Sequence, residues 1–226
     1  MKILNPEQWC HFPEPSWLPD EESIQRHFKL GSIMVGYKVG LARHMARFLP
    51  GDEALSLLDV GVGDCVLGSF FARYRSRTTV QGVEIKVRTH AASSIQVGSF
   101  DGVNLAFPDL SFDVVVLSNV LHHAAEAEKL LLECCRVARK SVLIKDHIYF
   151  GRWQWFQLAF LDWLGNARFG VAVPANYLSK NEWEKKAERA GGQWLFFDSL
   201  PLRKGAMKML FSNNLEVFFV VRLSDI

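Results

Sequence analysis

The sequence predicts an α/β fold whose sheet is mostly parallel. Continuous apolar runs such as 114–117 (Val-Val-Val-Leu) indicate strands that are buried on both faces, as in a parallel sheet. Stretches with helical spacing lie between these runs. A turn with two alternate glycines, Gly61 and Gly63, follows the first buried run and precedes a helix-compatible stretch. These three observations favour strand–turn–helix units joined in one sheet.

Most of the chain divides into predicted strands and helices. Strands are expected at 54–60, 79–84, 95–98, 113–119, 141–147, 193–198 and 216–223. Helices are expected at 35–49, 65–74, 124–138 and 153–164, with a short helix beginning at 20–23. The connection from Glu84 to Asp101 has little room for a helix, so a loop or a single turn is expected there.

Local signals bound the later helices. The helix at 153–164 should be capped by Gly165 or Asn166. Ser179 is a predicted N-cap, and a glutamate three residues later, Glu182, would complete a capping box. That helix should end at the glycine pair 191–192.

We expect one domain. Residues 1–50 form an N-terminal arm and helical cap that belong to it, the first twenty being irregular and rich in Pro and Trp. Residues 51–226 form the main body, with an aromatic helical insertion or lid at about 149–178.

Composition narrows the class of protein. With 226 residues, 49% of them hydrophobic, the chain can bury a substantial core. A net charge of +2 without a basic cluster gives no nucleic-acid surface. No apolar run reaches the ~18 residues of a membrane span, and the first residues do not resemble a signal peptide. None of the four cysteines forms a C-x-x-C pair, so no zinc or redox site is indicated, and a cytoplasmic location is expected.

The glycine turn and a later acid predict a nucleoside-containing cofactor. Gly61 and Gly63 let a ligand approach the main chain, because glycine has no Cβ to obstruct it. Glu84 ends the next strand about twenty residues on, where a carboxylate can accept both ribose hydroxyls. Asp59, two residues before the turn, should brace it by accepting backbone N–H bonds.

The glycine spacing leaves two cofactors open. A dinucleotide fingerprint needs a third glycine where the chain has Val66, with Gly68 two residues late; this weakens an NAD-dependent oxidoreductase without excluding it. The D-x-G-x-G pattern at 59–63 resembles the first motif of class I S-adenosylmethionine-dependent methyltransferases, whose usual third glycine is Cys65 here.

Later segments strengthen this resemblance. Residues 100–123 resemble the "D-x-x-x-LPFPD-x-SFD-x-V" stretch and "LHH" ending of the small-molecule branch, which includes the ubiquinone- and menaquinone-pathway C-methyltransferases. Residues 131–147 resemble the following helix and fifth strand. The resemblance covers about 54–147. It implies a Rossmann-like three-layer sandwich with a seven-stranded, mostly parallel sheet whose last strand is antiparallel.

The resemblance also implies site residues for S-adenosylmethionine and its product S-adenosylhomocysteine. Asp101 corresponds to the acid that hydrogen-bonds the adenine amino group, with Phe100 and Gly102 lining the base. Ser118 and Asn119 end the fourth strand, which the topology puts under the sulfonium.

Candidates for the chemistry lie at the ends of the fourth and fifth strands. A general base is needed only if the acceptor must lose a proton, and an imidazole titrates in the useful range. We therefore expect catalytic residues among His147, His122 and Asp146. Residues expected to contact the acceptor are His123, Trp155, Asp162, Asn166 and Tyr177. No metal is expected.

The sequence thus predicts a methyltransferase acting on a small, apolar or aromatic molecule. Two alternatives remain: an NAD-dependent oxidoreductase, and a non-catalytic cofactor-binding partner subunit. The acceptor, the alkylated element and the oligomeric state are left open.

Overall fold

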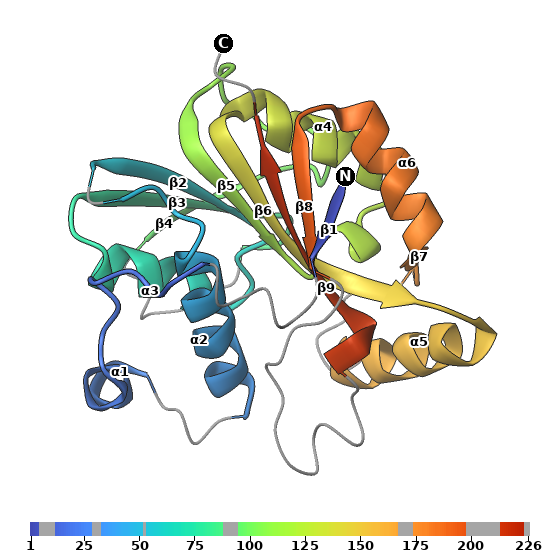
Figure 1. The fold of residues 1–226 in the computed structure, drawn as a ribbon, viewed down its shortest axis with the longest axis horizontal. Coiled ribbons are helices and arrows are strands. Elements are labelled where there is room, and N and C mark those ends of the chain that lie inside the picture. The colour runs from blue at the N-terminus through green and yellow to red at the C-terminus, as the bar shows by residue number, and fades with distance from the viewer. Residues whose placement is uncertain are drawn as a thin grey trace.

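A mixed nine-stranded sheet runs through the molecule (Figure 1). The computed structural model describes residues 1–4, 12–28, 33–51, 53–87, 95–166, 174–197 and 213–223. The strands are β1 (Lys2–Leu4), β2 (Leu55–Val60), β3 (Thr78–Glu84), β4 (Gln96–Ser99), β5 (Phe112–Ser118), β6 (Ala138–Tyr149), β7 (Leu178–Ser179), β8 (Gln193–Phe197) and β9 (Glu216–Arg222). Their order is β1-β8-β9-β6-β5-β2-β3-β4, with β7 beside β6. Only β9 is antiparallel to its neighbours among these pairs.

Helices cover both faces of the sheet (Figure 1). Side chains of α4 (Ala127–Val137) and α6 (Lys180–Ala190) pack on one face. Those of α1 (Glu21–His27), α2 (Ile33–Ala46) and α3 (Val66–Tyr74) pack on the other. The fold is therefore the predicted Rossmann-like sandwich, with N-terminal helices that fit a cap. The remaining α-helix, α5 (Arg152–Asn166), directly follows β6 in the chain.

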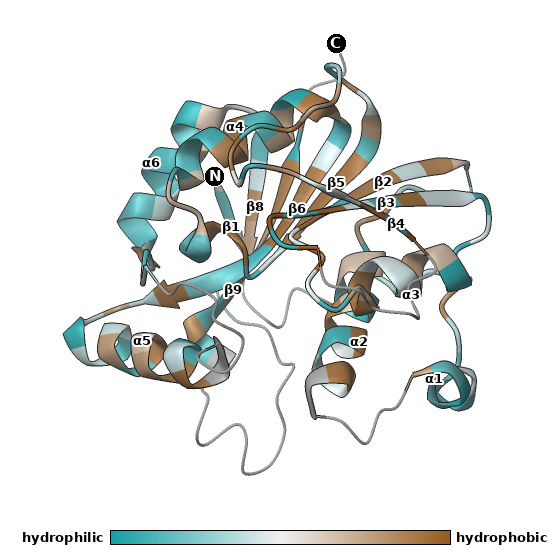
Figure 2. Cartoon of the chain, turned by 180° about the vertical axis from the view of Figure 1, so that it is seen from behind, coloured by the Kyte–Doolittle hydropathy of each residue, from teal (hydrophilic) through white to brown (hydrophobic). Residues whose placement is uncertain are grey.

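The central strands explain the continuous apolar runs. In β5, Val115 and Leu117 belong to the core under α4 and α6, while Val114 and Val116 belong to the core under α2 and α3. All four are fully buried. Hydropathy colouring shows these strands as largely apolar (Figure 2). Because alternate residues point to opposite faces, a strand covered on both sides needs apolar residues at every position.

The register aligns the carboxyl ends of the central strands. Val60 of β2 pairs with Val83 of β3 and with Leu117 of β5, which in turn pairs with Ile144 of β6. The residues that follow these positions therefore meet at one edge of the sheet, where ligands bind in open α/β folds.

The predicted end of α6 and its N-terminal box are confirmed. The Glu182 carboxylate accepts hydrogen bonds from both the N–H and the hydroxyl of Ser179, each at 2.7 Å. Gly191 follows the helix with φ of 71°, a conformation that glycine adopts at little cost.

Some boundaries differ from the prediction. Residues 2–4 form β1, parallel to β8, rather than irregular chain; three residues at a sheet edge are too few for a periodic signal. The helix α5 continues through Gly165 and Asn166, so neither is a cap outside it. The strand β6 begins at Ala138, where a helix was expected, and extends beyond His147.

The middle of the connection after β3 (88–94) and the expected strand end at 198 lie outside the described residues. Within the described part of the chain, no helix is long and apolar enough to cross a membrane.

Candidate functional site

The glycine turn joins β2 to α3 and lies against the end of β5. Gly61 and Gly63 have φ of +71° and +54°. A Cβ on Gly61 would come within 2.6 Å of Val120 Cγ2, whereas a Cβ on Gly63 would have only Lys38 Nζ within 4 Å, at 3.9 Å. Gly61 is therefore required by packing, and Gly63 exposes backbone that a ligand can approach.

Glu84 is hydrogen-bonded to this turn. Its carboxylate accepts the Gly63 N–H and the Ile85 N–H, each at 2.9 Å and each on a different oxygen. A carboxylate oxygen has a second lone pair, so both oxygens can still accept a hydroxyl. The two backbone bonds fix the orientation of the carboxylate at the end of β3.

Asp59 is buried beneath α3. Burial raises the pKa of its carboxyl to about 7, while the Lys38 charge and the Gly68 N–H oppose this rise. A Cβ on Gly68 would lie 2.9 Å from Asp59 Oδ2 and 2.8 Å from Ile95 Cδ1. Asp59 thus meets the first turn of the helix, and Gly68 allows the close helix–strand approach that a third fingerprint glycine normally provides, although it comes two residues late.

Asp101 follows β4 in a tight turn. Its carboxylate accepts hydrogen bonds from the N–H of Val103 at 2.8 Å and from the N–H and side chain of Asn104, both at 2.6 Å. These bonds lower its pKa, the Asn104 side chain having the largest effect. Asp101 is therefore an exposed, ionised acceptor, flanked by Phe100 and by Gly102 with φ of +90°.

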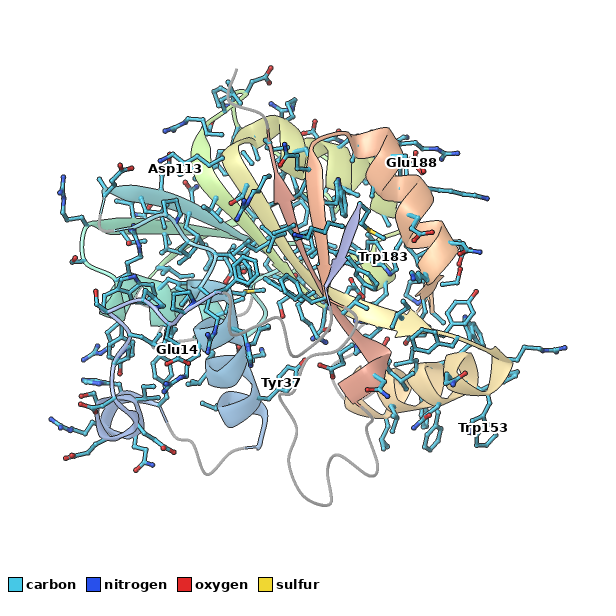
Figure 3. All side chains as sticks on the ribbon, in the orientation of Figure 1. Glu14, Tyr37, Asp113, Trp153, Trp183 and Glu188 are labelled. Carbon is cyan, nitrogen blue, oxygen red and sulfur yellow. The ribbon has the colours of Figure 1, made fainter. Side chains whose placement is uncertain are left out.

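The sequence interpretation missed two residues of α2. Lys38 Nζ lies 2.6 Å from Asp64 Oδ1 in the glycine turn. Tyr37 lies on the side of α2 that faces β9 (Figure 3), and its hydroxyl donates to Glu216 at 2.7 Å. Apart from their polarity, nothing in the local sequence distinguishes these residues from others on a surface helix.

A buried ion pair supports the end of β5. Lys145 Nζ lies 3.5 Å from the Glu216 carboxylate, and both side chains are fully buried. Lys145 also donates to the side chain of Asn119, which has a positive φ of 57°. Lys145 and Glu216 are charged residues that adjoin apolar runs within their strands, and this was the sequence signal that could have identified them.

The three predicted catalytic residues, His122, Asp146 and His147, lie close together, the first after the end of β5 and the other two within β6. Asp146 Oδ1 lies 2.6 Å from His122 Nδ1 and accepts the His147 N–H at 2.7 Å. Burial would raise the pKa of Asp146, but the His122 charge and hydrogen bond, the His147 N–H and the Lys145 charge outweigh it and lower the pKa. The His122 and His147 rings are 5.0 Å apart between centroids.

A second carboxylate, Asp162 of α5, lies on the other side of His122. Asp162 Oδ2 is 3.6 Å from His122 Nε2, and Oδ1 is 3.5 Å from His123 Nε2. The Tyr177 hydroxyl donates to Asp162 at 2.8 Å. Burial and this bond raise the pKa of Tyr177 well above its usual value, so its hydroxyl is a neutral donor.

The structure thus brings together most of the residues that were expected to contact the methyl acceptor. Trp155 of α5 packs near Tyr177, with 6.4 Å between ring centroids. Asn166 ends the same helix, but its side chain lies outside the described residues.

Residues 58–144 match the model of a methyltransferase domain. No curated protein matches the chain. Among solved structures, it is similar to a chain of the complex between the Haloferax volcanii Trm112 methyltransferase activator and a methyltransferase, with 14% identity, a TM-score of 0.60, and coverage of 92% of this chain and 94% of that one.

Two further structures have the same fold. A SAM-dependent methyltransferase from Thermotoga maritima is 15% identical, with a TM-score of 0.57 and coverage of 89% and 95%. The YcgJ protein from Bacillus subtilis is 16% identical, with a TM-score of 0.55 and coverage of 74% and 88%. The matched domain does not favour the NAD-dependent alternative; it implies S-adenosylmethionine as the cofactor and, with the fold, supports the class I S-adenosylmethionine-dependent methyltransferase superfamily.

Proposed function

We propose that the protein methylates a small, apolar or aromatic molecule bound beside His122, His123 and Asp162. The observation that carries this proposal is the close approach of Val120 to Gly61, where an added Cβ would lie 2.6 Å from Val120 Cγ2. Val120 immediately precedes the 3-10 turn that carries both histidines (Leu121–His123). The cofactor turn and the polar cluster therefore adjoin, as an in-line transfer requires.

On the cofactor side, three polar parts of the cofactor have a candidate partner. Glu84 would accept hydrogen bonds from the ribose hydroxyls, and Asp101 would accept one from the adenine amino group. Lys38 supplies a cation beside Gly63, where it can pair with the cofactor's methionine carboxylate. When bound, S-adenosylmethionine supplies a methyl group already activated on a sulfonium, so the protein mainly has to bind and orient the two reactants.

On the acceptor side, we assign binding and activation to the predicted catalytic residues. The Asp146 carboxylate accepts a hydrogen bond from the Nδ1–H of His122, which directs the Nε2 atom of His122 toward Asp162. The neighbouring His147 ring extends the same polar wall. Trp155 and the buried Tyr177 place aromatic rings beside it, which suits an apolar or aromatic acceptor and agrees with the motif resemblance to quinone-pathway enzymes.

Transfer of an isotopically labelled methyl group tests the proposal. Wild-type protein, S-adenosylmethionine with a labelled methyl, and a panel of phenols, quinols, thiols and amines should give labelled product. Calorimetry should show saturable binding of S-adenosylhomocysteine and none of NAD. Cofactor binding without transfer to any acceptor would instead favour the non-catalytic partner subunit, and failure to bind S-adenosylhomocysteine would reject both.

A further inference from the structure

The geometry points to a divalent transition-metal site formed by His122 Nε2, His123 Nε2 and the Asp162 carboxylate. One ligand atom from each residue lies within 4.8 Å of the others. Two come from the turn after β5 and the third from α5, so the fold brings together residues about forty positions apart. The sequence led us to expect no metal, and this site departs from that expectation.

The nitrogen–oxygen separations fit coordination better than hydrogen bonding. Asp162 Oδ2 lies 3.6 Å from His122 Nε2, and Asp162 Oδ1 lies 3.5 Å from His123 Nε2. Both distances exceed the roughly 2.7–3.2 Å of an N–H···O bond. Two ligands bonded to one tetrahedral Zn²⁺ at about 2.0–2.2 Å lie about 3.4 Å apart, close to the separations observed.

The surrounding hydrogen bonds are those of a metal site. A histidine ligand usually donates its other ring N–H to a carboxylate, and His122 Nδ1 lies 2.6 Å from Asp146 Oδ1. A ligating carboxylate is in turn hydrogen-bonded, and Asp162 accepts from Tyr177 at 2.8 Å. His122 and Asp162 are therefore already oriented by neighbouring residues.

Three protein ligands leave one coordination position open, which is the pattern of catalytic zinc. On the proposed function, that position would take the acceptor's nucleophilic oxygen or sulfur, whose proton passes to solvent on binding. The metal-bound anion would then form the new bond to the methyl carbon as the methyl–sulfur bond breaks. Metal binding itself requires no methyl transfer.

Titration of chelator-treated, tag-free protein with Co²⁺ and then Zn²⁺ tests the site. Wild-type protein should bind one equivalent of Co²⁺ with visible d–d bands of a four- or five-coordinate ion and no thiolate charge-transfer band, and Zn²⁺ should displace it. Asp146→Asn should lower the Zn²⁺ affinity roughly 10–100-fold, the usual cost of losing an orienting partner. His123→Ala should lower it at least as much, since a ligand is removed.

His27→Ala, on the exposed helix α1, is the matched control and should leave metal affinity unchanged. Calorimetry with S-adenosylhomocysteine on the same samples separates this inference from the proposed function, because His123→Ala should bind it as the wild type does. Absence of stoichiometric Co²⁺ binding, thiolate ligation, or equal affinity in His123→Ala and the wild type would overturn the metal site whether or not the cofactor binds.

Discussion

The Glu84 carboxylate accepts the backbone N–H of Gly63 at 2.9 Å, joining the end of β3 to the turn after β2. This bond couples the two halves of the proposed cofactor site. The glycine that leaves room for a ligand also orients the acid that would bind its ribose. A change at Glu84 should therefore affect cofactor binding both through the ribose and through the turn.

Glu84→Gln is expected to weaken S-adenosylhomocysteine binding by more than about 1 kcal/mol, or roughly fivefold, because a charged acceptor is lost. Isothermal titration calorimetry measures the change. The matched control is Glu188→Gln on the exposed surface of α6 (Figure 3), which should bind the cofactor as the wild type does. Equal affinity of Glu84→Gln and the wild type would remove Glu84 from the site.

Lys38→Met should weaken S-adenosylhomocysteine binding roughly tenfold or more, since a hydrogen bond between charged groups is removed. The expected cause is loss of a partner for the methionine carboxylate. 5′-Methylthioadenosine lacks that carboxylate, so its affinity should change little in the same variant. Similar losses for both ligands would show that Lys38 acts by holding the turn through Asp64 instead.

Gly61→Ala should destabilise the fold by about 1–3 kcal/mol, because alanine is strained at a φ of +71° and its Cβ would meet Val120. Urea unfolding measures the loss. Gly51→Ala is the matched control, since no atom lies within 4 Å of its added Cβ and its φ is not in the left-handed region. Equal stability of the two variants would mean that the turn can relax, and would weaken its rigid role in the cofactor site.

Much of this arrangement could be predicted because its signals are local. The glycine turn, the acid at Glu84 and the apolar runs of β2 and β5 can each be recognised within a short stretch of sequence. The strand register then places them at the same edge of the sheet. The cluster around Asp162 could not be predicted in the same way. Its contacts join Asp162 to His122 and Tyr177, which lie far away along the chain, and a single sequence carries no signal of such pairing.

Asp59 should make stability depend on pH. Its folded pKa of about 7 lies above the ordinary 3.8, so the folded state keeps a proton that the unfolded state has lost. Its contribution to stability is therefore greatest below about pH 4 and falls as the pH rises through 7. Asp59→Asn removes this dependence, so its stability relative to the wild type should rise by roughly 4 kcal/mol between those limits.

Urea unfolding at about pH 4 and about pH 8 measures this change, with the wild type run in parallel. The difference between the two proteins matters rather than the absolute value, since the buried amide has its own pH-independent cost. A difference that stays constant with pH would mean that Asp59 is ionised in the fold throughout this range.

Replacing two tryptophans should distinguish the core from the outer face of α5 by the stability that each replacement costs. Trp183 is 1% exposed, packs on Phe219 and donates to the His147 carbonyl at 3.3 Å, whereas Trp153 is 79% exposed and points away from the body (Figure 3). Trp183→Ala should cost about 3–5 kcal/mol of unfolding free energy, and Trp153→Ala less than about 0.5. Chemical denaturation measures both. A large loss in Trp153→Ala would mean that the aromatic outer face of α5 is packed in solution, and that this helix is core rather than the predicted lid.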